Sequence, residues 1–418
     1  MQVATKTHMR FLVAATLALV LGLFQPITAQ AQKFTVLYAF RGGNDGGGPF
    51  DAPLLDKAGN LYGTTAFDGK RGAGVVYKVP SGTRGKETVI HTFEDVDGFG
   101  GYGPLIFDEK GNLYGEGVGG ENNHGVVYRL SPNQDGTWTQ AVLYNFFGSE
   151  IDGDTPSGGL VSDAAGNLYG STLYGGGRGC SSSGGCGTIF KLSPSDGAFW
   201  KETILYRFSG GAGGQNPNAV VLDRNGNIYG TAFGGGNTPG TVFRLTPSGN
   251  RWMFELLHTF GKGNDGAFPA GPLIFGKSGK LYGTTTGGGL LFYGTIFELS
   301  QDANGKWLET VIYSFTGNAD GCTPYGAVTS DANGNLFGTT SGGAPYCNNT
   351  FGSVYELKYS PGLWTVVPLH DFAGGADGDT PLGGVVLDKA GNLYGTTSSL
   401  QGLGNVHGNV FEVSSFIH

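Results

Sequence analysis

A five-residue pattern, G-N-L-Y-G, returns seven times along the chain and constrains its architecture more than any other feature. The copies, three of them with one substitution, begin at Gly59, Gly111, Gly166, Gly226, Gly279, Gly334 and Gly391. Two copies extend to ten identical residues, DKAGNLYGTT, at 56–65 and 388–397. The spacing of 52 to 60 residues is close to that of propeller blades and too long for leucine-rich or β-helix coils. The pattern therefore predicts a structural unit built seven times, rather than one site used twice.

Each repeat contains four candidate strands, which we name a, b, c and d in chain order. In the third repeat they lie at 158–163, 167–172, 187–193 and 200–208. Strands a and b are joined by D-x-x-G-N in six of the seven repeats, whereas the fifth repeat has Gly276 in place of the Asp. An Asp at the start of a turn caps backbone N–H groups, and a Gly three residues later supplies a positive φ. The a–b connection is therefore predicted to be a tight hairpin.

The strand count predicts a closed ring. Strands a, b and c occur seven times, but only six d strands follow a c strand, because the last repeat (383–413) ends after c. The seventh d-type strand is KFTVLYAF (33–40), which precedes the first a strand. An N-terminal strand that completes the last blade removes the exposed edges of an open array. We therefore expect an all-β fold, one seven-bladed β-propeller of four-stranded blades over residues 32–418.

The first 31 residues have the features of a secretory signal peptide. Lys6, His8 and Arg10 precede an apolar stretch at 11–24, and an A-x-A cleavage site lies at 29–31. An uncleaved anchor is the alternative, although fourteen apolar residues are few for a bilayer span. No later segment is apolar enough to cross a membrane, and the C-terminal VFEVSSFIH shows no sorting tail. We expect a secreted, periplasmic or cell-envelope protein, and a monomer.

Charge argues against some classes of partner. Removal of the predicted signal peptide takes away Lys6 and Arg10 and changes the formal net charge from −8 to −10. A chain with this acidic balance is a poor match for nucleic acid or anionic lipid. We therefore expect no nucleic-acid partner.

The repeat units resemble a known family. They combine D-x-x-G-N-L-Y-G-T-T, strands similar to G-T-V-F-K-L-S-P, an L-Y-x-F strand end and a D-G-x-x-P loop. In these features the chain is similar to the GloVer tandem repeat proteins of bacterial envelopes over nearly all of 33–413. The resemblance implies a secreted or surface-attached bacterial protein with a β-propeller-like repeat fold, and it leaves the biochemical role open.

Register within the repeat separates structural residues from functional candidates. The tryptophans lie six residues before the Tyr or His of strand d, at Trp138, Trp200, Trp252, Trp307 and Trp364. We expect them to pack at the blade periphery, with an outer sugar-binding platform as the alternative. His91, His258 and His370 occupy a position that other blades fill with Tyr. We therefore interpret them as polar aromatic residues rather than metal ligands.

The four cysteines break register. Cys180 and Cys186 bracket a Gly/Ser-rich b–c loop, whereas Cys322 and Cys347 lie in a d–a loop and a b–c loop that meet at one blade. Four cysteines allow three pairings. Export favours oxidation, and proximity favours Cys180 with Cys186 and Cys322 with Cys347. Metal binding is the alternative, although the spacing fits no standard zinc pattern.

An acidic column recurs in the d–a loops. It comprises Asp45, Asp97, Asp152, Asp265, Asp320 and Asp377, and blade 4 has no acid there. Asp154 and Asp379 add second carboxylates to two of these loops. One interpretation is an Asp-Gly turn in which each carboxylate caps its own loop. The other is a cation-binding ring near the channel mouth, with Ca²⁺ as the candidate cofactor, because calcium takes six to eight oxygen ligands.

The d–a and b–c loops carry a surplus of aromatic and apolar residues, including the run LLFY at 290–293. Exposed apolar groups in loops often mark recognition surfaces. The candidate ligand-binding residues are Phe99, Tyr102, Phe292, Tyr293 and Tyr325. Alternatively, these side chains pack together over the channel mouth.

Three functions fit the sequence. The first is a binding module that meets a glycan or an envelope protein partner through the aromatic loop face. The second is an extracytoplasmic enzyme, a metal-dependent hydrolase or lactonase or a polysaccharide-active propeller. The third is a scaffold without a specific small ligand. We find no nucleophile elbow and no H-E-x-x-H, so we assign no catalytic residue and favour a protein that is not an enzyme.

Overall fold

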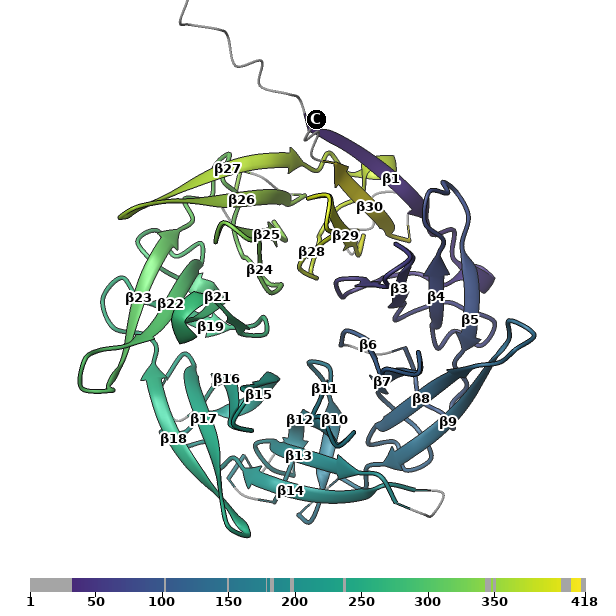
Figure 1. Ribbon diagram of the computed structural model, residues 1–418, viewed down its shortest axis with the longest axis horizontal. Coiled ribbons are helices and arrows are strands. Elements are labelled where there is room, and N and C mark those ends of the chain that lie inside the picture. The colour runs from purple at the N-terminus through teal and green to yellow at the C-terminus, as the bar shows by residue number, and fades with distance from the viewer. Residues whose placement is uncertain are drawn as a thin grey trace, which may run out of the picture. The chain divides into compact units, whose positions relative to one another are not determined.

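The chain is described by a computed structural model that covers 32–100, 103–148, 150–177, 179–180, 184–195, 199–235, 238–342, 347–348, 351–399 and 407–414. The predicted signal peptide (1–31) and Tyr102 lie outside these described residues. The described residues from Lys33 onward belong to one compact unit. Within it, seven antiparallel sheets follow one another around a ring (Figure 1).

Each sheet is one blade, and its strands a to d run from the inside of the ring outward. Blade 1 contains β2 (Leu54–Leu55), β3 (Leu61–Thr64), β4 (Val75–Val79) and β5 (Thr88–Thr92). Blade 2 contains β6 (Ile106–Phe107), β7 (Leu113–Gly117), β8 (Val126–Pro132) and β9 (Trp138–Asn145). Blade 3 contains β10 (Gly153–Pro156), β11 (Val161–Ser162), β12 (Leu168–Gly175), β13 (Thr188–Ser193) and β14 (Lys201–Arg207). Blade 4 contains β15 (Gln215–Leu222), β16 (Ile228–Gly234), β17 (Thr241–Ser248) and β18 (Arg251–Thr259).

The remaining three blades complete the ring. Blade 5 contains β19 (Gly266–Pro269), β20 (Ile274–Phe275), β21 (Leu281–Gly288), β22 (Thr295–Gln301) and β23 (Trp307–Ser314). Blade 6 contains β24 (Thr329–Ser330), β25 (Leu336–Thr340), β26 (Ser353–Ser360) and β27 (Leu363–Asp371). Blade 7 contains β28 (Val386–Leu387), β29 (Leu393–Thr397), β30 (Asn409–Ser414) and β1 (Lys33–Ala39). The described residues also form the short 3₁₀ segments η1 (Gly43–Asp45), η3 (Lys277–Gly279) and η4 (Gly375–Asp377).

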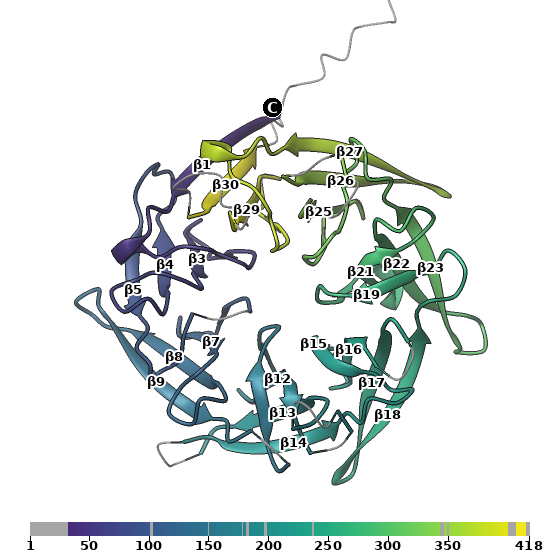
Figure 2. The same ribbon diagram turned by 180° about the vertical axis from the view of Figure 1, so that it is seen from behind.

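The N-terminal strand closes the ring, as the strand count predicts. β1 pairs antiparallel with β30, from Lys33 opposite Ser414 to Ala39 opposite Asn409. The purple β1 lies along the yellow β30 in Figure 1, and Figure 2 shows the same pairing from behind. The sheet order β1-β30-β29-β28 therefore gives blade 7 the same four strands as the other blades. The prediction of a closed seven-bladed propeller is confirmed.

The a–b corner forms for the reason that its sequence indicates. Asp56 Oδ1 accepts hydrogen bonds from the backbone N–H groups of Ala58 and Asn60, at 2.9 and 2.8 Å. Its Oδ2 accepts from the Asn60 amide (2.7 Å) and from the Tyr62 hydroxyl (3.1 Å). Gly59 supplies the left-handed conformation, with φ at +83°. Burial alone would raise the pKa of Asp56, but these hydrogen bonds to the charged form lower it below its usual value.

Successive residues of strand b pack into two different interfaces. Leu61 packs with Phe40 and Tyr77 on one side of its blade. Tyr62 points the other way and packs with Leu113 of the next blade and with Trp138, which is partly buried there. Alternation along the strand thus joins each blade to both of its neighbours. The expected packing of Trp138 at the blade periphery is confirmed.

The innermost strand is shorter than the sequence predicts. In blade 3 we expected a strand over 158–163, but only Val161 and Ser162 pair with β12. Gly158 and Gly159 adopt φ values of +106° and +85° and interrupt the ladder. A Cβ on Gly158 would lie 2.5 Å from the backbone nitrogen of Ala219 in blade 4, so close contact between blades takes precedence over strand pairing here. The d–a loop replaces part of the lost pairing, because Gly153–Pro156 forms β10, which pairs with the same strand β12.

Candidate functional site

The blades touch each other around the axis through a column of small residues. The column comprises Gly103, Gly158, Gly271, Gly326 and Gly383, with Asn218 at the equivalent position of blade 4 and Asp51 at that of blade 1. A Cβ on Gly383 would lie 2.4 Å from the backbone nitrogen of Ala52, and one on Gly326 would lie 2.2 Å from that of Gly384. Neighbouring inner loops therefore meet backbone to backbone. Asp51 is the one acid in this column.

The Asp51 carboxyl lies in the inner layer with an unused oxygen. The backbone N–H of Gly103, in the next blade, donates a hydrogen bond to it. Its Oδ2 atom is buried and has no hydrogen-bond partner. Burial raises the pKa of Asp51 to about 7, against the lowering effect of the Gly103 hydrogen bond. Asp51 is therefore partly protonated near neutral pH.

Glu116 is a second departure from register, in strand b. The other blades have a hydroxyl residue at this position, Thr64, Ser171, Thr231, Thr284, Thr339 or Thr396. Several of these hydroxyls donate to an inner-loop carbonyl, as Thr339 does to Gly383 at 2.6 Å. Glu116 instead accepts a hydrogen bond from the Gly159 backbone at 3.0 Å, and its Oε1 is buried without a partner.

The charge of Asp51 affects Glu116. Burial raises the pKa of Glu116 to about 8, the Gly159 hydrogen bond lowers it, and the charge of Asp51 raises it further. Burial and then the charges of Glu116 and Asp51 raise the pKa of Tyr128, whose hydroxyl is buried without a partner. Glu116 is only 1% exposed, so it acts on blade packing rather than on a solvent-borne substrate. The sequence analysis did not single out either residue, although each is recognisable as the one acid in its column of the repeat.

The acidic column pairs with the Tyr/His column of strand d. Each carboxylate bonds the aromatic residue at the end of the preceding strand, in the pairs Tyr38–Asp45, His91–Asp97, Tyr144–Asp152, His258–Asp265, Tyr313–Asp320 and His370–Asp377. Most of these carboxylates also accept a hydrogen bond from a nearby backbone N–H group, as Asp320 does from Thr316 at 2.8 Å. The carboxylates therefore lie at the outer end of each d–a loop, beside strand d. The structure brings each to its own aromatic partner and does not gather the six together.

A third column meets these pairs across the blade interface. This column lies on strand d of the following blade, four residues before the Tyr or His of that same strand. Its members are Glu87, Gln140, Glu202, Phe254, Glu309, Val366 and Phe34. Phe34 stacks on His370 with ring centroids 3.7 Å apart. Burial, followed by the charge of Asp152, raises the pKa of Glu202 to about 8. Burial and Asp265 likewise raise the pKa of Glu309 to about 7. Acids at this position therefore share a confined space with a second carboxylate.

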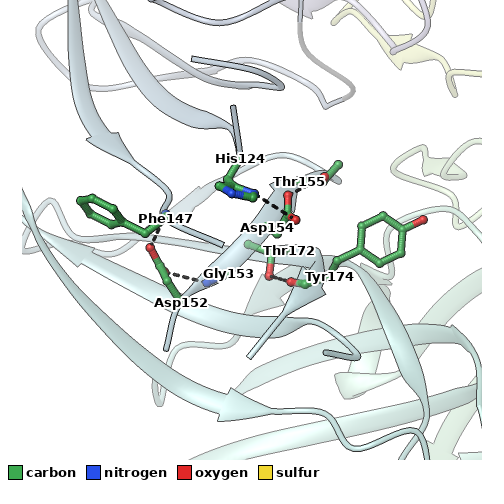
Figure 3. A network of polar contacts seen from close by, with 8 residues as sticks. All are labelled: His124, Phe147, Asp152, Gly153, Asp154, Thr155, Thr172 and Tyr174. Carbon is green, nitrogen blue, oxygen red and sulfur yellow. Dashed lines mark hydrogen bonds and ion pairs between the residues drawn. The ribbon is translucent and has the colours of Figure 1, made fainter. Parts of the chain in front are cut away.

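The D-G-D loop of blade 3 directs its two carboxylates to different partners (Figure 3). Asp152 accepts from the backbone of Phe147 at 2.8 Å and of Gly153 at 2.6 Å. Asp154 contacts His124 Nδ1 at 3.1 Å and accepts the Thr155 hydroxyl at 3.0 Å. Asp152 thus holds its own loop, whereas Asp154 joins it to the b–c loop of blade 2. The neighbouring Tyr174 ring points away from this network (Figure 3).

The candidate ligand-binding residues differ in exposure. Phe292 is 78% exposed and Tyr325 is 45% exposed. Phe99 is half-buried and packs with the core between blades 1 and 2. Tyr293 is half-buried against Gly317, at the position that His124 occupies in blade 2. Phe292 and Tyr325 are therefore available to a partner, Phe99 and Tyr293 serve packing, and Tyr102 lies outside the described residues.

Five exposed apolar side chains lie on neighbouring, hydrogen-bonded segments of blades 4 and 5. We call this set the blade 4–5 patch: Phe233, Phe268, Leu290, Leu291 and Phe292. The rings of Phe233 and Phe268 lie 5.3 Å apart. Phe268 and Phe292 adopt left-handed φ values of +59° and +65°, which bulky residues seldom do. The backbone thus holds these side chains outward at a conformational cost.

The cysteines form both of the favoured disulfides, Cys180–Cys186 and Cys322–Cys347. The first closes the b–c loop of blade 3, and the second joins the d–a loop before blade 6 to the b–c loop of that blade. These bonds indicate an extracytoplasmic compartment. No helix among the described residues has the length and apolar character that a membrane span requires.

These observations define a seven-bladed β-propeller with two disulfides and an apolar patch on its loop face. The Gloeobacter/Verrucomicrobia repeat model matches residues 21–183 and 178–411. The chain belongs to this family, which confirms the resemblance seen in the sequence.

Solved structures share the fold at low sequence identity. A Bacteroides fragilis protein, described as a proposed 6-phosphogluconolactonase, is 14% identical with a TM-score of 0.51, over 83% of this chain and 96% of its own. A Lactobacillus plantarum protein is 14% identical with a TM-score of 0.50, over 76% and 83%. A Thermus protein, described as a proposed oxidoreductase of the glucose dehydrogenase type, is 16% identical with a TM-score of 0.44, over 81% and 99%. No curated relative matches the chain. At these identities the likeness to the Bacteroides and Lactobacillus proteins shows the fold alone.

Proposed function

We propose that this protein is an extracytoplasmic binding module that docks another envelope protein through the blade 4–5 patch. The observation that carries the proposal is the exposure of five apolar side chains on adjoining loops. Clusters of this kind on a soluble domain often mark interaction sites. Aromatic residues supply much of the binding energy in protein interfaces.

Backbone hydrogen bonds link the loops that carry the patch. Gly289 N–H donates to the Asp265 carbonyl at 2.7 Å, and Phe268 N–H donates to the Pro239 carbonyl at 2.5 Å. The Thr286 hydroxyl donates to the Phe268 carbonyl at 3.1 Å. A surface held in this way loses little conformational entropy on binding. The adjacent aliphatic Leu290 and Leu291 favour a protein partner over a glycan, because sugars stack on flat rings that have polar groups beside them.

The patch also refines the expected set of binding residues. Phe292 remains its most exposed member. Tyr325 follows Pro324 in the next d–a loop, and we place it at the edge of the same loop face. Phe99 and Tyr293 support the loops from beneath.

The test compares retention of envelope components by the native chain and by Phe268→Ala/Phe292→Ala. We expect the double variant to lose at least tenfold in affinity for its main partner, since two aromatic anchors are removed. The matched control is Leu363→Ala, which removes a 62% exposed apolar residue from the c–d end of blade 6. Equal losses in both variants, or none in either, would contradict the proposal. A parallel glycan array tests for a glycan partner. Binding to the array, with no protein partner retained, would show that the patch recognises a glycan instead of a protein.

A further inference from the structure

We propose that His258, Asp265 and Glu309 bind a divalent transition-metal ion, with Zn²⁺ the best fit, at the outer interface of blades 4 and 5. His258 Nε2 lies 3.0 Å from Asp265 Oδ2. One ligand atom from each of the three residues lies within 4.8 Å of the others, and no other group of three or more such residues does so in the described part of the chain. Ligands about 2.1 Å from Zn²⁺ are about 3.4 Å apart in a tetrahedron, so small side-chain shifts suffice.

The donor set suits such an ion. An imidazole and two carboxylates are ligands that Zn²⁺ commonly takes, and the two negative charges balance the charge of the ion. Asp265 Oδ1 accepts the Gly266 N–H at 2.7 Å, which fixes the carboxylate and directs Oδ2 toward His258. The Asp265 side chain is only 7% exposed.

The acid of this column leaves one oxygen unused, as do Glu87 and Glu202 at the same position of other blades, where the neighbour is Tyr instead of His. Glu309 Oε1 is buried and has no hydrogen-bond partner. A buried carboxylate oxygen without a partner is costly, because it has lost its water and gained no donor. A metal ion between Glu309 and Asp265 would satisfy this oxygen and remove the repulsion between the two acids.

The sevenfold repeat provides an internal control. The site needs His in the Tyr/His column, Asp in the loop column and an acid in the column from the following blade. At the blade 1–2 interface His91 and Asp97 meet Gln140. At the blade 6–7 interface Phe34 covers His370. Elsewhere the aromatic residue is Tyr, so all three conditions coincide only at blades 4 and 5.

The cluster is accessible from solvent. A groove of 630 Å³ adjoins it and is lined by Lys262, Asn264 and Lys306 as well as by the three proposed ligands. Water from the groove can complete a four-coordinate shell. The Asp265 carbonyl also accepts the Gly289 N–H beside Leu290, so a bound ion would brace the loop of the blade 4–5 patch. The proposal of a metal site does not depend on the partner proposed for that patch.

Metal binding is tested on the tag-free, metal-stripped chain with the ions alone. Calorimetric titration with Zn²⁺ should give one bound ion per chain, and Co²⁺ should give the visible absorption bands of a four-coordinate site. His258→Tyr places the residue of other blades at this position and should lower the Zn²⁺ affinity at least tenfold. Glu309→Gln should do the same. His91→Tyr is the matched control and should leave the titration unchanged.

A gain-of-site variant makes the proposal sharper. Gln140→Glu completes the three columns beside His91 and Asp97, and it should raise the stoichiometry to two ions per chain. Stoichiometry that stays at one would contradict the column argument. An equal loss of affinity in His91→Tyr, or no Zn²⁺ binding by the native chain at about 100 µM, would overturn the site itself. Circular dichroism confirms that each variant is folded.

Discussion

At the level of single residues, the repeat makes departures informative. Asp51 is the one acid in a column where the other blades have Gly or Asn, and Glu116 is the one acid in a column of hydroxyl residues. Both are held by a backbone N–H of a neighbouring blade, and both keep a buried oxygen without a partner. Their raised pKa values follow from this burial. Glu116 is the clearer case, because almost none of it reaches solvent.

The Glu116 carboxyl makes stability depend on pH. Its pKa rises from 4.5 to about 8 in the folded chain, so the native state holds a proton that the unfolded state has lost. The stabilisation is therefore complete below pH 4.5, and it falls by about 1.4 kcal/mol per pH unit until pH passes about 8. Glu116→Gln does not titrate. We expect its free energy of unfolding, measured in urea, to exceed that of the native chain by a margin that grows from pH 5 to pH 8.

The comparison of Glu116→Gln with the native chain must allow for other titrating groups near Glu116. Asp51 and Tyr128 interact with its charge, and they are present in both chains. Glu121→Gln, an exposed change in the same blade, should show no such trend. A margin for Glu116→Gln that is the same at pH 5 and pH 8 would refute the assigned pKa.

At the level of elements, loops are held by three kinds of link. Asp caps close the a–b corners, Tyr/His–Asp pairs close the d–a loops, and disulfides fasten two of the b–c loops. The caps and pairs recur from blade to blade, whereas each disulfide occurs once. Blade 4 lacks the loop acid and stacks Tyr206 on Phe254 instead, with ring centroids 4.4 Å apart. The same position can therefore be closed by a polar pair or by aromatic packing.

The two disulfides should differ in their effect on stability. Cys322–Cys347 spans a sequence separation of 25 and Cys180–Cys186 one of 6. Loop-closure entropy predicts losses of about 3.5 and about 2.3 kcal/mol when each is replaced by a Ser pair. Urea unfolding of the two double variants measures both values. The larger loss should belong to Cys322→Ser/Cys347→Ser, and the reverse order would argue against an entropic origin.

At the level of the whole molecule, closure depends on β1. The strand covers the outer edge of β30, and Tyr38 and Phe40 pack into the core shared with blade 1. Without β1, blade 7 presents an unpaired strand with free N–H and C=O groups. Such an edge pairs readily with another chain.

Removal of residues 32–40 should therefore open the ring. We expect the shortened chain to unfold at a lower temperature and to form dimers or larger species, as measured by circular dichroism and by size-exclusion chromatography with light scattering. The synthetic peptide KFTVLYAF should restore the monomer, and a scrambled peptide of the same composition should not. A monomeric shortened chain with unchanged thermal stability would show that closure by β1 is dispensable.

Much of this architecture could be predicted from the sequence because its signals are local and repeated. The Asp of the a–b corner and its Gly lie three residues apart, and seven copies reveal the period without any alignment of other proteins. Cysteine proximity in the chain was enough to favour the observed pairs. The interruption of strand a at Gly158 was missed, because it results from contact with Ala219 in a different blade.

The candidate sites depended on contacts that no local pattern reports. His258, viewed along its own strand, is one more polar aromatic residue in a Tyr column. Only the fold brings Glu309, 51 positions away in the chain, beside it and Asp265. Likewise Phe292 and Tyr293 are neighbours in sequence, yet one side chain is exposed and the other is half-buried.

The sequence by itself determined the blade count, the closure and the compartment of this protein, because turns, strand periodicity and repeated spacing are encoded within a few residues. The tertiary structure alone decided which columns of adjacent blades face each other and which loop side chains remain exposed. Those outcomes depend on packing between strands that lie some fifty residues apart in the chain. The stabilising free energy there comes from contacts between two blades, so no single segment encodes it.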